Sequence, residues 1–92
     1  MDEAFLISQR DELRAQLTQL RTARDRLASA AMSAADEMAR LERLEPGSVA
    51  EATLARSRRA QEQLVALDDQ IKSLIDTLRT VEDRLAAQRE TG

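Results

Sequence analysis

The sequence lacks cysteine, histidine, tryptophan and tyrosine, and Phe5 is its single aromatic residue. The absence of cysteine excludes disulfides, and the absence of both cysteine and histidine excludes the usual zinc ligands and the Ser–His or Cys–His nucleophilic pairs. Neighbouring carboxylates, as in Asp36-Glu37 and Asp68-Asp69, point away from each other on a helix. No glycine-rich phosphate loop is present. We therefore expect no metal site, no cofactor and no catalytic residue.

Long runs of one charge and long apolar runs are also missing. The chain has 14 basic and 17 acidic residues, with a net charge of −3, and no charged tail suited to nucleic acid or a lipid surface. The basic cluster Arg56-Ser57-Arg58-Arg59 lies within a turn or two of Glu51 and Glu62, and no aromatic residue is near it to stack on bases. The run Ala4-Phe5-Leu6-Ile7 is too short for a membrane span or a signal peptide. We expect no nucleic acid, membrane or small-molecule substrate, and a cytoplasmic location.

Proline and glycine are scarce, and their positions divide the chain. Pro46-Gly47 lies near the midpoint of 92 residues, and the only other glycine is the last residue. One helix running through this pair would lose about 4 kcal/mol by propensity alone. Ser48 followed by Glu51 matches a capping box, which marks a helix N-terminus. The sequence predicts a helix at about 3–45, a turn at 46–48 and a helix at about 49–89.

Leucines and small apolar residues repeat in heptads through both halves of the chain. The two series face each other when the numbers of paired residues add up to 91, as for Leu6 with Leu85 and Leu20 with Ile71. The midpoint of this register falls at the predicted turn, so two independent signals agree. The sequence predicts a single all-α domain over residues 1–92, a two-helix antiparallel coiled-coil hairpin. The apolar seam positions of the first helix are Leu6, Leu13, Leu17, Leu20, Leu27, Ala31, Ala34, Met38 and Leu41. The seam positions of the second helix, which pair with the first helix in reverse order, are Ala50, Thr53, Ser57, Ala60, Leu64, Leu67, Ile71, Leu74, Leu78, Val81 and Leu85.

Two arginines, Arg10 and Arg24, occupy seam positions. In this register Arg10 is opposite Val81 and Arg24 is opposite Leu67. Glu82 and Asp68 each lie one residue from those opposing positions. The aliphatic stems can cover the seam while the guanidinium groups reach these carboxylates. The alternative is that the arginines contact an outside partner or forbid a wrong register.

Several apolar residues fall outside the seam and form a candidate second contact stripe. Two helices that share one narrow seam bury little apolar area, and oligomerisation is the usual remedy for such small chains. We therefore expect two hairpins to dimerise into a four-helix bundle, or one hairpin to pair with a helical partner. The predicted partner-binding residues are Phe5, Ile7, Leu54, Val65 and Ile75.

These features favour a non-enzymatic protein–protein interaction module, acting as an adaptor, chaperone or assembly component through helix packing. The predicted hairpin also resembles, in architecture alone, the secreted Trp-X-Gly hairpins of type VII secretion, which pair as four-helix bundles. That resemblance implies export as a pair. The turn here reads Glu45-Pro46-Gly47, and no Trp or C-terminal Tyr is present, so no functional residue carries over.

A third possibility is a small helical enzyme similar to the all-helical chorismate mutases, which clamp their substrate between basic and acidic side chains. Arg10, Arg14, Lys72 and Glu82 would form such a set. These enzymes have three helices and a characteristic lysine after the first, whereas the stretch after Leu27 is alanine-rich and has no lysine. This is the least favoured of the three interpretations.

Overall fold

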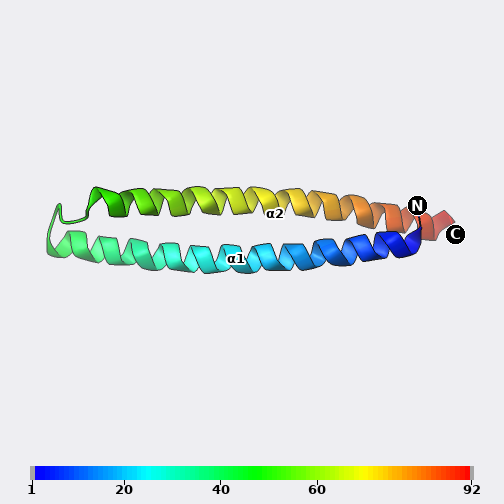
Figure 1. The fold of residues 1–92 in the computed structure, drawn as a ribbon, viewed down its shortest axis with the longest axis horizontal. Coiled ribbons are helices and arrows are strands. Elements are labelled where there is room, and N and C mark those ends of the chain that lie inside the picture. Colours follow the sequence, from blue (N-terminus) through cyan, green and yellow to red (C-terminus); the bar gives the residue numbers. More distant parts are fainter. Residues whose placement is uncertain (1, 92) are drawn as a thin grey trace. The chain divides into compact units, whose positions relative to one another are not determined.

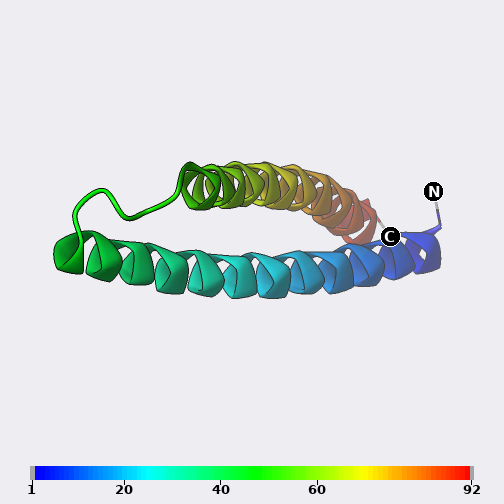
Figure 2. The same ribbon diagram turned by 60° about the vertical axis from the view of Figure 1, so that its left-hand side comes forward.

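A computed structural model describes residues 2–91 and consists of two helices, α1 (Glu3–Leu44) and α2 (Glu51–Thr91). The helices run antiparallel and pack against each other, and the part of the chain that the structure describes has no strand (Figure 1). The predicted all-α hairpin is confirmed. Figure 2 shows that the connection between the helices is a short irregular segment.

The connection is a tight turn built on Pro46 and Gly47. The backbone N–H of Ser48 donates to the carbonyl of Glu45 at 3.0 Å. Gly47 has a φ of +83°, and Pro46 precedes it, which is the residue pattern of a type II turn. The N–H of Gly47 also donates to Oε1 of Glu42 at 2.8 Å. The turn therefore depends on a backbone conformation that only glycine adopts without strain.

The expected capping box is wrong. Helix α2 begins at Glu51, and the N–H groups of Thr53 and Leu54 donate to the carbonyl of Ala50 at 3.0 and 3.2 Å, so Ala50 occupies the N-cap position. The hydroxyl of Ser48 instead donates to the carbonyl of Leu41 at 3.3 Å. The Leu41 carbonyl also accepts the backbone N–H of Glu45 at 2.9 Å, so Ser48 adds a second hydrogen bond at the C-terminus of α1. The N-cap of α2 has no side-chain acceptor.

The chain divides into two compact units, each containing part of both helices. The terminal unit, residues 2–22 and 69–91 of those described, contains the core. Leu6, Val81 and Leu85 form one buried cluster, against which Ile7 and Leu13 pack. Leu17 is also buried. Leu6 and Leu85 were predicted partners, and Arg89 lies 3.3 Å from Glu3, which agrees with the predicted register.

The turn unit, Ala23–Asp68, has no buried side chain, although all of its residues are described. Its seam consists mainly of alanine, serine and threonine near the turn, so little apolar area is removed from water there. The free energy gained by burial is roughly proportional to that area. The hydrophobic stabilisation of the hairpin is therefore concentrated in the terminal unit.

The two seam arginines behave differently. Nε of Arg24 donates to Oδ1 of Asp68 at 3.1 Å, as the register predicts. Arg10 pairs instead with its neighbour Asp11, at 3.1 Å from Nη2, and the described residues show no ion pair between Arg10 and Glu82. Asp11 is exposed and Asp68 is half-buried, so water still reaches both carboxylates and each pair contributes no more than about 1 kcal/mol.

Candidate functional site

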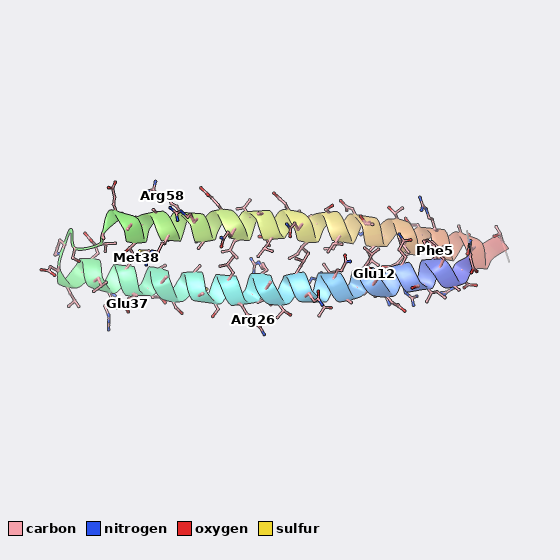
Figure 3. The ribbon with its side chains drawn as sticks, viewed as in Figure 1. Phe5, Glu12, Arg26, Glu37, Met38 and Arg58 are labelled. Atoms are coloured by element: carbon pink, nitrogen blue, oxygen red, sulfur yellow. The ribbon has the colours of Figure 1, made fainter. Side chains whose placement is uncertain are left out.

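The predicted partner-binding residues are distributed over both units. Phe5, labelled in Figure 3, and Val65 are exposed, as is Leu54, whereas Ile7 and Ile75 are half-buried. Ile7 packs against the core cluster, so only part of its side chain is available to a partner. Leu54 and Val65 are 11 residues apart, about three helical turns, and share one side of α2. Only these two belong to the turn unit.

Large exposed apolar side chains gather in the turn unit. Of the six described, only Phe5 belongs to the terminal unit, and the other five are Met32, Leu41, Leu44, Leu54 and Val65. The sequence prediction missed Met32 and Leu44, and it placed Leu41 in the seam, where it remains 42% exposed. These residues do not form one patch, because Met32 and Leu41 are nine residues apart and lie on opposite sides of α1. Each is a candidate for contact with a partner.

An open groove of about 250 Å³ lies along the seam of the turn unit. Small seam residues, including Ala31 and Ala34 on α1 and Ser57 and Ala60 on α2, leave this space unfilled. Met38, labelled in Figure 3, borders the groove, and Arg56 is the one charged residue in its lining. The groove can accept an apolar side chain, because its walls are mostly aliphatic.

A second groove, of about 460 Å³, lies beside the turn. Its polar side chain, Glu42, already accepts a hydrogen bond from Gly47. The remaining lining residues are Met38, Ala39, Gly47, Val49 and Leu54. Apart from the Glu42 carboxylate, the side chains that line this groove are apolar.

The terminal unit has a different, charged pocket of about 200 Å³. Two of its arginines are engaged with carboxylates, Arg10 with Asp11 and Arg89 with Glu3. Of the set considered for a mutase-like reaction, Arg10, Arg14 and Glu82 line this pocket, and Lys72 does not. The full lining is Arg10, Arg14, Glu82, Leu85, Ala86 and Arg89.

Within residues 2–91, no three acidic side chains come together in a way that could hold a metal ion. No helix in that range is both long enough and apolar enough to cross a membrane. Comparisons with protein-family models, with curated proteins and with solved structures give no match.

Proposed function

We propose that the protein is a non-enzymatic interaction module whose turn unit binds another helical surface. The observation that supports this most strongly is the contrast between the two units. The turn unit buries no side chain, yet it has five of the six large exposed apolar residues and two apolar grooves. A partner that packs on part of this exposed apolar area supplies burial that the turn unit itself lacks, and adaptors, chaperones and assembly components act in this way.

The accessible surface area supports the same conclusion. The chain exposes 6900 Å², whereas a compact monomer of 10.3 kDa exposes about 5,400 Å², so about 1,500 Å² is in excess. A stable protein–protein interface removes about 800 Å² from each partner. One such interface would therefore account for roughly half of the excess.

Sedimentation equilibrium of the purified chain, combined with far-UV circular dichroism over a range of concentrations, tests this proposal. We expect self-association, with helicity and melting temperature rising as concentration rises, because binding stabilises the folded state by mass action. A poorly helical monomer that becomes helical on adding a partner also supports it. A fully helical monomer with a concentration-independent unfolding free energy above about 5 kcal/mol would contradict it, because no partner would then be needed.

A further inference from the structure

One face of α1 in the turn unit points away from the seam and is apolar. It consists of Ala28, Met32, Ala35 and Ala39, whose spacing of four, three and four residues places them on one side of a helix. Met32 is 68% exposed, Ala35 and Ala39 are exposed, and Ala28 is half-buried. At 100° per residue, this outer face is about 100° around the helix from the seam residues, so α2 leaves most of it uncovered, although Ala39 borders the groove that Leu54 also lines.

We propose that the outer face binds a second copy of this chain, with α1 packed antiparallel against α1 and a two-fold axis between Ser33 and Ala34. This inference rests on the proposed function and names the partner. Ala28 and Ala39 are equally distant from the axis, as are Met32 and Ala35. Each Met32 therefore lies opposite Ala35 of the second copy, so that the large side chain of one helix meets a small one on the other.

Charges on either side of the outer face match in the same register. Asp25 and Arg43 are 18 residues, or five turns, apart on one edge, and Arg24 and Glu42 are the same distance apart on the other edge. The two-fold axis places Asp25 near Arg43 of the second copy, and Arg24 near Glu42 of the second copy. Arg43 has no ion pair among the described residues, and Asp25 has only a long one, 3.7 Å from Arg24. Arg24 is already paired with Asp68, and Glu42 accepts the N–H of Gly47, so the edge with Asp25 and Arg43 carries the argument.

This complementarity is what selects a second copy over an unrelated helix. Residues five turns apart are separated by about 27 Å along one helix, so Asp25 and Arg43 cannot pair within a chain. An isologous interface, in which the same patch meets itself, needs the same face to hold both members of each pair. The outer face does so for its one large side chain and for the charges Asp25 and Arg43 on one of its edges.

The first test compares Met32→Glu with Ser33→Glu by sedimentation equilibrium and circular dichroism. Both substitutions place a carboxylate at an exposed position of α1, but Ser33 lies about 130° around the helix from the centre of the outer face. We expect Met32→Glu to raise the dimer dissociation constant roughly tenfold or more, because it desolvates a charge, with monomer helicity unchanged. Ser33→Glu should leave the dissociation constant within about twofold of the wild-type value.

The second test is a charge exchange. Asp25→Arg alone should weaken the dimer by placing like charges together, and adding Arg43→Asp in the same chain should restore it. A wild-type dimer that Met32→Glu leaves intact overturns the outer-face proposal but leaves the proposed function standing. A wild-type chain that stays monomeric overturns the outer-face proposal as well, and the proposed function is then decided by whether that monomer is fully helical and stable. Failure of the charge exchange to restore binding rejects the antiparallel register.

Discussion

Truncation of Leu85 should destabilise the hairpin far more than truncation of an equally large leucine near the turn. Leu85 is 3% exposed and packs in the cluster with Leu6 and Val81. Leu→Ala at buried sites costs 2–5 kcal/mol, and we expect about 2–3 kcal/mol here, because a cluster between only two helices relaxes readily. A loss of this size lowers the melting temperature of a small domain by roughly 10–20 °C.

Urea denaturation followed by far-UV circular dichroism measures this loss, with Leu44→Ala as the matched control. Leu44 is 75% exposed, so the same substitution should change the unfolding free energy by about 0.5 kcal/mol or less. Both variants should be compared at one protein concentration, since association contributes to apparent stability. Equal losses at the two positions would refute the conclusion that the core lies in the terminal unit.

Two further predictions concern the turn. Gly47→Ala should lower the free energy of unfolding by about 1–2 kcal/mol, because alanine is strained at a φ of +83° although a Cβ there meets no atom within 4 Å. Gly47→Asn should lower it less in the same urea titration. An alanine variant as stable as the wild type would argue against this turn geometry. Ala50→Ser should stabilise the chain by about 1 kcal/mol, because it supplies the missing acceptor at the N-cap of α2. Ala52→Ser, inside the first turn of α2, should give no such gain in thermal melts, and equal effects at the two positions would argue against Ala50 as the N-cap.

The hairpin and its register could be predicted because they depend on repeated signals. Heptad spacing and the single Pro-Gly pair each indicate the same midpoint, and the Leu6–Leu85 and Arg24–Asp68 contacts follow from it. The start of α2 depends instead on the Ser48 hydroxyl, which could accept a backbone N–H of α2 or donate to a carbonyl of α1. Ser48 bonds back to Leu41, because the turn holds it against α1, and local sequence does not reveal this choice.

The exposed apolar residues were harder to predict, because exposure depends on how well a seam closes. Leu41 has the right spacing for the seam, but its counterpart in the predicted register is the small Ala50, and Leu41 stays partly exposed. Met32 was missed because it lies off the heptad positions that define the seam. A scan for apolar residues at the remaining heptad positions would have found it, together with the alanines of the same face.

The position of the core has a kinetic consequence. Leu6 and Leu85 lie near opposite ends of the chain, so their contact closes nearly the whole polypeptide into one loop. The turn brings together residues of the turn unit, whose contacts bury little apolar area. Folding can begin at Pro46-Gly47 at small entropic cost, but apolar side chains are buried only when the two ends of the hairpin meet. Loss of a short segment that contains Leu6 or Leu85 would therefore remove this contact and leave a chain that starts the hairpin without completing it.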